Sequence, residues 1–404
     1  MLLFLFLFVF ISFAGYAQSV SREQAKQIAI DFVQEEANSL RSSKQVSLDL
    51  IYECQDTCRS KSLRSESSSL FYIFNLNGQE GFVIVSGDER TPEILGYSFE
   101  SDFVVEGMPD NIQYWLDTYR DQIIDIRKIN PESVPVNKDT VPATYPILID
   151  TLDYDSRMLL EETVGSDSDL SLRASYASSV SPLVKTKWNQ DSPYNNLCPL
   201  DGGKRSVTGC VATALAQIMK YHEWPKKGIG SRTYTTKTKK LSVSANFGTT
   251  TYDWANMRDT YSSSYSATEA KAVATLMQHA GVASLMDYTN RESGANDFNA
   301  GCGLINYLGY NPDMQMYMRD YCSSTTWRNL LKEQLNAKLP LYYTGQGKDG
   351  GHAFVCDGYD SRDLFNINWG WGGANDGYFQ IDLMNPSYPG IGGGSGGYSK
   401  SQSV

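Results

Sequence analysis

The stretch 151–180 is the feature that most limits how this chain of 404 residues can fold. Between residues 151 and 173 it holds six acidic side chains, serines are frequent, and no apolar periodicity follows Leu160. Such a segment cannot bury enough apolar surface to form a core, so we expect an exposed linker that is easily cleaved. The chain is therefore predicted to fold as two units, one before residue 151 and one at 181–404.

The first residues have the order of a secretory signal peptide. Leu2–Phe13 is an apolar run broken only by Ser12, although no Lys or Arg precedes it, and Gly15-Tyr16-Ala17 supplies small residues before a cut after Ala17. The run is too short to span a bilayer as a helix. We expect residues 1–17 to be removed and the protein to be secreted, periplasmic or at the cell surface, with no membrane anchor.

Residues 18–150 are predicted to form a smaller domain that mixes helix and strand. Ser21 and Gln24 have the spacing of a capping box, and apolar residues at helical spacing follow them. The further elements expected are strands at 70–74 and 81–86 and an amphipathic helix at Ile112–Ile129. The segment contains no histidine, and no set of its residues looks catalytic.

Composition excludes several classes of function. Asp and Glu number 46 against 35 Lys and Arg, a net charge of −11, so nucleic acid is not expected as a partner. A zinc site with three histidine ligands would consume all three histidines of the chain, and we expect no metal or other cofactor. The seven cysteines leave at least one thiol unpaired within the chain. Cys54 and Cys58 form an isolated CxxxC, which favours a local disulfide or two free thiols over a zinc site.

Cys210 is the first candidate for chemistry. An Ala-rich amphipathic helix runs from Cys210 to Tyr221, and Gly209 allows a tight turn before it. A thiol at a helix N-terminus has its pKa lowered by the helix field, and the free N–H groups of the first turn can bind an oxyanion. The alternative interpretation is a small buried cysteine in a core helix.

A cysteine nucleophile needs a base, and three histidines are available. His222 lies twelve residues after Cys210 on the same helix, roughly 18 Å away at ~1.5 Å per residue, which is too far for a hydrogen bond. His279 lies in a helix with an apolar face and is expected to be structural. His352 follows two glycines and opens a strand, so it is the favoured base; the alternative is a strand-start histidine satisfied by a turn.

Two further segments could support this pair. Asn368 lies sixteen residues after His352 with a turn between them, so a hairpin could return it beside the imidazole, and Trp369 could shield the pair from water. The alternative is a buried aromatic corner. Gln190 precedes the cysteine and could donate to an oxyanion, although such residues near proline usually make turns.

Together these residues resemble a known family. Gln190, Gly209-Cys210, Gly351-His352 and Asn368-Trp369-Gly370-Trp371 are arranged as in the streptopain-type, papain-like cysteine peptidases of family C10. The resemblance covers about 181–403, and it includes a Gly-rich tail that ends near Tyr398. The first domain more loosely resembles the Spi-type inhibitory pro-domain of those zymogens.

The resemblance implies an α+β fold, in which a papain-like catalytic domain at 181–404 follows a smaller α+β pro-domain at 18–150. An N-terminal helix would carry the cysteine and an antiparallel sheet the histidine. It also implies a secreted cysteine endopeptidase that hydrolyses proteins or peptides, with a preference for a bulky apolar residue just before the cleaved one. The pro-domain would be an intramolecular inhibitor, removed by a cut between Val164 and Ser181, near Arg173.

The resemblance also implies a role for each site residue. Cys210 would be the nucleophile and His352 the general base and acid. Gln190 and the Cys210 N–H would form the oxyanion hole, and Asn368 or Trp369 would orient the imidazole. Ser293 and Gly351 would bind the backbone of the substrate.

Two other functions use the same residues. A transglutaminase-like acyl transferase has the same Cys–His chemistry but uses an amine in place of water. An adhesin or inhibitor could keep the papain fold without activity, in which case Cys210 would not react with thiol-directed reagents.

Overall fold

The computed structural model describes residues 19–39, 46–56, 69–128, 176–347, 350–383 and 402–404, and the structural statements below concern those residues. The expected signal peptide, the linker up to residue 175 and the Gly-rich tail at 385–398 lie outside them. Among the helices of the described ranges, none is long and apolar enough to cross a bilayer.

The N-terminal part has the mixed composition of helix and strand that the sequence predicts. Its elements are α1 (Arg22–Ser39), β1 (Leu48–Gln55), β2 (Ser69–Leu76), β3 (Phe82–Ser86), β4 (Ile94–Ser98) and α2 (Asp110–Lys128). The predicted capping box is present, because the Ser21 N–H donates to Gln24 Oε1 at 2.8 Å and the Gln24 N–H donates to Ser21 Oγ at 3.2 Å. The two predicted strands are confirmed as the antiparallel pair β2–β3, and the predicted helix as α2.

The part from residue 176 onward contains a helical region and a sheet. Its helices are α4 (Cys210–His222), α5 (Ala267–Ala283), α6 (Asp297–Leu308) and α7 (Ser324–Asn336), with short 3₁₀ turns at Phe247–Thr249, Trp254–Asn256 and Arg319–Tyr321. Its strands are β5 (Leu200–Asp201), β6 (Lys204–Arg205), β7 (Ser231–Thr235), β8 (Ser242–Asn246), β9 (Leu341–Gly347), β10 (Gly350–Tyr359), β11 (Phe365–Asn368) and β12 (Gly377–Phe379).

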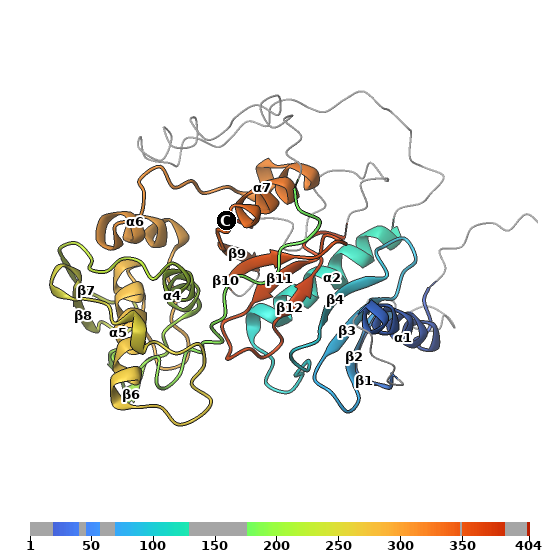
Figure 1. The fold of residues 1–404 in the computed structure, drawn as a ribbon, viewed down its shortest axis with the longest axis horizontal. Coiled ribbons are helices and arrows are strands. Elements are labelled where there is room, and N and C mark those ends of the chain that lie inside the picture. The colour runs from blue at the N-terminus through green and yellow to red at the C-terminus, as the bar shows by residue number, and fades with distance from the viewer. Residues whose placement is uncertain (1–18, 40–45, 57–68, 129–175, 348–349, 384–401) are drawn as a thin grey trace, which may run out of the picture.

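One antiparallel sheet joins the two parts of the chain. Its eight strands have the order β1-β2-β3-β4-β12-β11-β10-β9, so the N-terminal part supplies four and the C-terminal part four (Figure 1). The join is the pair β4–β12, in which Tyr378 lies opposite Tyr97 and Phe379 opposite Gly96. A Cβ on Gly96 would lie 2.9 Å from the Phe379 ring, so the close approach of the two strands requires glycine.

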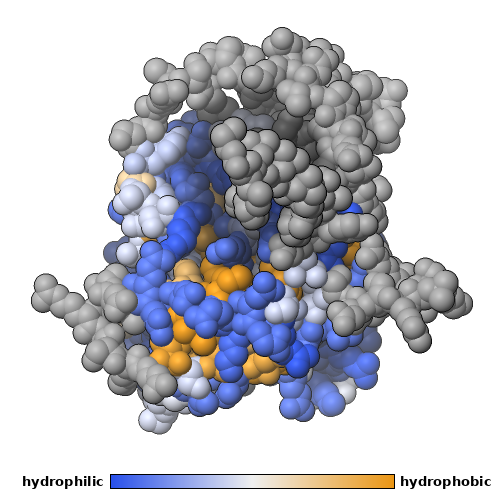
Figure 2. Space-filling view, turned by 90° about the vertical axis from the view of Figure 1, so that its right-hand side faces the viewer, coloured by the Kyte–Doolittle hydropathy of each residue, from blue (hydrophilic) through white to orange (hydrophobic). Residues whose placement is uncertain are grey.

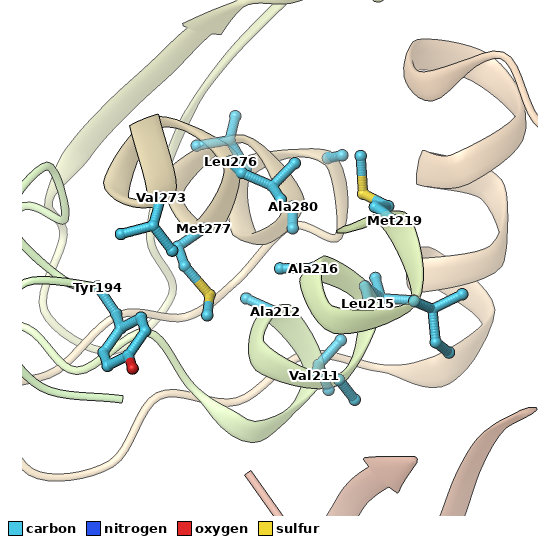
Figure 3. Close-up of a cluster of buried hydrophobic side chains, with 14 of the residues drawn as sticks. Tyr194, Val211, Ala212, Leu215, Ala216, Met219, Val273, Leu276, Met277 and Ala280 are labelled. Carbon is cyan, nitrogen blue, oxygen red and sulfur yellow. The ribbon is translucent and has the colours of Figure 1, made fainter. Parts of the chain in front are cut away.

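Two apolar cores flank the C-terminal strands. One lies in the helical region, where α4 packs on α5 through small and flexible side chains; Figure 3 shows Ala212 and Ala216 of α4 facing Met277 and Ala280 of α5. The other lies under α2, and it combines residues of α2 with aromatic residues of β10, β11 and β12. The four C-terminal strands therefore have one face toward α4 and one face toward α2.

The outer helix α1 covers the other face of the N-terminal strands. Ala25, Ala29, Phe32 and Val33 are buried against β2 and β3 at the helical spacing that the sequence predicts. Seen from this end of the molecule, the surface is largely hydrophilic, with apolar residues showing between the polar ones (Figure 2). On the neighbouring strand β1, Cys54 is a buried free thiol, while Cys58 lies outside the described residues.

A buried carboxyl on β10 makes this fold sensitive to pH. Asp357 is 1% exposed; its Oδ2 accepts a hydrogen bond from the Val184 N–H at 2.7 Å, and its Oδ1 has no partner among the described residues. Burial raises its pKa to about 7, with a further rise from the charge of Asp376 and an opposing effect of Lys187. Because its pKa is 3.8 when unperturbed, the folded state binds more protons than the unfolded state between these values.

We therefore predict that Asp357→Asn stabilises the protein in a pH-dependent way. The contribution of Asp357 to the free energy of unfolding is complete below pH ~4 and is lost as the pH rises through the folded pKa of its carboxyl. The amide that replaces this carboxyl does not titrate, so the variant does not lose this stability. The melting temperature of the variant should match that of the parent near pH 4 and exceed it by about 2–5 °C at pH 8. Calorimetry checks this, with Asp313→Asn at an exposed turn as the control; an equal difference at both pH values would contradict the prediction.

Candidate active site

Cys210 is the first residue of α4, as the sequence predicts. Gly209 precedes it with φ +84°, and a Cβ there would lie 2.6 Å from the carbonyl oxygen of Ser293. Both the left-handed conformation and the close contact require glycine. The turn therefore fixes the thiol at the helix N-terminus and holds the loop that contains Ser293 against it.

The surroundings of the Cys210 sulfur favour two opposite outcomes. Backbone groups of Ala353, on β10, and of Val211, in the first helical turn, hydrogen-bond to the thiol and lower its pKa. Burial has the larger effect and raises the pKa, and the charge of Asp297 raises it further. The prediction that the helix N-terminus lowers the pKa of the Cys210 thiol is therefore wrong for this structure, because the effect of burial is larger.

His352 lies near the start of β10, directly before the residue that contacts the thiol. It pairs with Gly345 of β9, and Ala353 pairs with Thr344. The ring lies 5.7 Å from the ring of Tyr114 on α2, centroid to centroid, and is half-buried there. Burial lowers the pKa of His352, while the charges of Asp110 and Glu292 raise it. The imidazole therefore packs against the N-terminal part, while its neighbour Ala353 contacts the sulfur.

A second residue of the N-terminal part reaches the Trp-Gly-Trp segment that directly follows β11. Asn111, the second residue of α2, donates from Nδ2 to the Trp369 carbonyl at 3.2 Å. Its Oδ1 accepts from the Trp371 indole N–H at 2.9 Å. Asn111 is 1% exposed, so these bonds are made out of contact with solvent. The amide ties the start of α2 to the Trp-Gly-Trp segment.

Asn368 returns toward the histidine strand, as the sequence predicts, but its amide is committed elsewhere. It lies opposite Val355 in the β10–β11 ladder, three residues along from His352. Its Oδ1 accepts from Gln217 Nε2 at 3.0 Å, and its Nδ2 donates to the Thr186 carbonyl at 2.8 Å. In this form of the protein the Asn368 amide therefore ties α4 to the segment before Gln190.

Trp369 is the centre of the aromatic core under α2. It is 1% exposed, and its indole N–H donates to the Asn375 carbonyl at 3.0 Å. Its ring lies 5.5 Å from Trp115 and 4.9 Å from Phe354. These contacts place Trp369 in the buried aromatic corner that was the alternative, and its shielding of His352 stays a prediction.

The remaining predicted residues lie on three other chain segments. Gln190 is 5% exposed, and its carbonyl accepts from the Thr208 N–H at 3.1 Å, two residues before the cysteine. Ser293 is 5% exposed, and its hydroxyl accepts from the Thr289 N–H at 3.0 Å. Gly351 is the second residue of β10 and directly precedes His352.

The other two histidines are placed as the sequence predicts. His222 is the last residue of α4, at the opposite end from Cys210. His279 is 5% exposed within α5 and lies 3.0 Å from the Tyr252 hydroxyl. Burial lowers the pKa of His279 to about 4, so it is a structural histidine.

Sequence reasoning missed the residues of α2 and the amide of Gln217. Asn111, Tyr114 and Trp115 stand in a segment without histidine or cysteine, so nothing in their types marks them as part of a site. Gln217 lies on the same helix as Cys210, seven residues on, and is completely buried. In the sequence, the one signal for it is a glutamine among the apolar residues of an Ala-rich helix, because such a side chain needs a hydrogen-bond partner when it is buried.

The contact between His352 and Tyr114 predicts a change in titration. Tyr114→Ala should expose the imidazole, and because burial is the largest cause of its low pKa, the pKa of His352 should rise toward its ordinary value. Histidine-selective NMR measures this with three resonances to assign. His279, buried in the other core, is an internal control that should not move. An unchanged pKa for His352 would show that α2 does not cover the ring.

Comparisons with known proteins agree with this arrangement. The family model described as "Peptidase C10 family" matches residues 188–379, and the model described as "Spi protease inhibitor" matches residues 17–123. Streptopain of Streptococcus pyogenes is 33% identical over 97% of this chain and 92% of its own length. The thiol protease/hemagglutinin PrtT of Porphyromonas gingivalis is 31% identical over 96% of this chain and 42% of its own length.

Solved structures show the same relationship. Prointerpain A of Prevotella intermedia superposes with a TM-score of 0.65 and 35% identity, over 88% of this chain and 97% of that one. Active interpain A superposes with a TM-score of 0.50 and 43% identity, over 56% of this chain and 94% of that one. The expected α+β fold, with an inhibitory domain before a papain-like domain, is confirmed. The chain belongs to the peptidase C10 (streptopain) family and is a cysteine protease zymogen with an inhibitory pro-domain.

Proposed function

We propose that Cys210 is the nucleophile of this protease and His352 its general base and acid. The observation that carries the proposal is the contact of the Cys210 thiol, at the N-terminus of α4, with the backbone of Ala353, the residue next to His352. In the active enzyme the imidazole would leave the Tyr114 ring, against which it packs here, and lie against the sulfur.

Removal of the pro-domain has a simple electrostatic consequence. Burial raises the pKa of the thiol and lowers that of the imidazole, so both groups are held in their neutral forms. Loss of α2 uncovers His352 and lets the two groups approach, which favours the thiolate and the imidazolium together. The active enzyme then has the ion pair that a thiol protease needs.

The reaction follows from these positions. The Cys210 thiolate attacks the carbonyl carbon of a peptide bond, and the oxyanion is bound by the Cys210 N–H and the side chain of Gln190. The imidazolium of His352 protonates the leaving amine. His352 then takes a proton from water, which hydrolyses the thioester and frees the sulfur. Asn368 or Trp369 would orient the imidazole: Asn368 lies opposite Val355, three residues along β10 from His352, and Trp369 packs on Phe354, two residues along.

Proteins or peptides are the substrates that we propose. Ser293 and Gly351 lie on the two segments that flank the catalytic pair, the loop held against Gly209 and the start of β10. A substrate strand between them could bond its backbone to both, which fixes the scissile carbonyl at the sulfur. A bulky apolar residue before the cleaved one remains the preference that the family resemblance implies.

We also propose the processing of the chain and its destination. Residues 1–17 direct secretion, 18–150 form the pro-domain, 151–180 are the linker, and 181–404 are the protease. The cut between Val164 and Ser181, near Arg173, is made by the enzyme itself. The acidic, serine-rich composition of the linker supports this, because such segments are accessible to proteases.

Cys210→Ala should abolish hydrolysis of casein, with a loss of at least about a thousandfold, because it removes the nucleophile. The variant should also accumulate as the unprocessed chain. The matched control is Cys302→Ala, which removes another half-buried thiol, on α6, and should keep its activity and processing. Hydrolysis by the Cys210→Ala variant would contradict the assignment. If the parent enzyme transferred the acyl group to an added amine and did not hydrolyse the substrate, it would be an acyl transferase.

Trp115→Ala should weaken inhibition by the pro-domain. The indole is 2% exposed and packs on Phe354, Trp369 and Phe379, so its loss costs about 3–5 kcal/mol of packing between the pro-domain and the protease. The unprocessed variant should cleave a fluorogenic peptide at least about tenfold faster than the parent zymogen, or mature faster. Gln113→Ala, on the same helix, is the control. A variant that folds but stays as inactive as the parent would show that α2 is not the inhibitory element.

A further inference from the structure

A carboxylate that the proposed mechanism does not use lies beside the nucleophile. Asp297 is the first residue of α6, and its side chain is tied to β9 by two hydrogen bonds. The Tyr342 hydroxyl donates to one oxygen at 2.8 Å, and the Thr344 hydroxyl donates to the other at 3.1 Å. Two donors on opposite oxygens fix the carboxylate plane, so the group is built into the fold and does not move freely at the surface.

The sheet register places this carboxylate next to the catalytic pair. Thr344 lies opposite Ala353 in the β9–β10 ladder, and the Ala353 backbone hydrogen-bonds to the Cys210 thiol. Tyr342 is two residues along β9, so both donors to Asp297 stand on the strand that neighbours His352. The charge of Asp297 raises the pKa of the Cys210 thiol, and the charges of Asp297 and Cys210 both raise the pKa of the Tyr342 hydroxyl.

This charge is not neutralised within the described ranges. None of the ion pairs formed there includes Asp297, which is half-buried. Burial raises its pKa, while the hydrogen bonds of Tyr342 and Thr344 and the N-terminus of α6 favour the ionised form. A carboxylate accepts about four hydrogen bonds, and two of these positions are used. Among the described residues only the Tyr342 and Thr344 hydroxyls donate to this carboxylate, so a cationic donor would find two acceptor positions on it.

We propose that Asp297 is a specificity-determining residue, and that it selects substrates with an arginine or lysine side chain next to the scissile bond. This inference rests on the proposed assignment of Cys210 as the nucleophile. A guanidinium can bind both free lone pairs of the carboxylate, and an ammonium can bind one. A neutral side chain at the same place leaves the half-buried charge without a partner.

The bound cation also helps the chemistry. A negative charge beside a thiol disfavours the thiolate, so Asp297 slows the enzyme when no cation is present. A substrate cation that pairs with Asp297 removes this effect at the moment of attack. Selectivity therefore falls on kcat/KM through both binding and the reactivity of the sulfur.

The test compares peptides that differ only in arginine against citrulline, its neutral isostere, placed in turn at each position around the scissile bond. At one position the mature enzyme should cleave the arginine peptide about tenfold faster in kcat/KM. Asp297→Asn should bring this ratio close to one, while Asp297→Glu should keep most of it. Asp313→Asn removes the same charge from an exposed turn and should leave the ratio unchanged. Both peptides are assayed with the same preparation of each enzyme. A smaller folded fraction lowers both rates equally, so it does not change the ratio of the two kcat/KM values.

Two further readouts separate this role from a structural one. With the citrulline peptide, the acidic limb of kcat/KM should move to lower pH in Asp297→Asn, because loss of the neighbouring charge lowers the thiol pKa. If that variant does not fold, raising NaCl to about 0.5 M should reduce the ratio of the parent enzyme. Equal cleavage of arginine and citrulline peptides at every position, or an unchanged ratio in an active Asp297→Asn enzyme, would overturn the inference. Hydrolysis by Cys210→Ala would instead overturn the assignment of the nucleophile.

Discussion

The packing of Trp115 into the aromatic core under α2 is the interaction on which the rest of the structure depends. Its ring lies 5.5 Å from Trp369, 5.8 Å from Phe354 and 6.2 Å from Phe379, residues that come from three segments of the protease. Phe354 follows His352 by two residues, and Trp369 follows Asn368 directly. The pro-domain therefore packs on the strands that carry His352 and Asn368, two of the residues proposed for the active site.

Two neighbours of Trp115 along α2, Asn111 and Tyr114, contact the segments that carry the proposed site. Asn111 bonds the Trp-Gly-Trp segment after β11, and Tyr114 packs on the imidazole of His352 on β10. One turn of α2 therefore contacts both strands of the β10–β11 hairpin or their direct extensions. The join of β4 to β12 makes the same contact continuous through the sheet. Burial opposes charge on the imidazole, which Tyr114 covers, and also on the thiol, so the zymogen holds both groups in their neutral forms.

Local signals in the sequence predicted much of this molecule, and long-range packing supplied the rest. The helix that starts at Cys210, the hairpin after His352 and the capping box at Ser21 follow from glycine placement, apolar spacing and cap chemistry. The sheet that crosses from the pro-domain to the protease could not be foreseen, because β4 and β12 are short and carry no mark of their pairing. The predicted direction of the Cys210 pKa shift was wrong for the same reason. The helix N-terminus can be recognised in the sequence, whereas the burial that outweighs its effect is a property of the assembled fold.

The central claim is that the pro-domain holds Cys210 and His352 as separate neutral groups, and that its removal allows them to form an ion pair. The pH dependence of the alkylation of Cys210 by iodoacetamide, followed by mass spectrometry of its peptide, tests this claim in the zymogen and in the mature enzyme. The account predicts that the mature enzyme reacts rapidly at mildly acidic pH, while the zymogen reacts only as the pH approaches the ordinary range of a thiol or above. Identical profiles for the two forms would contradict it.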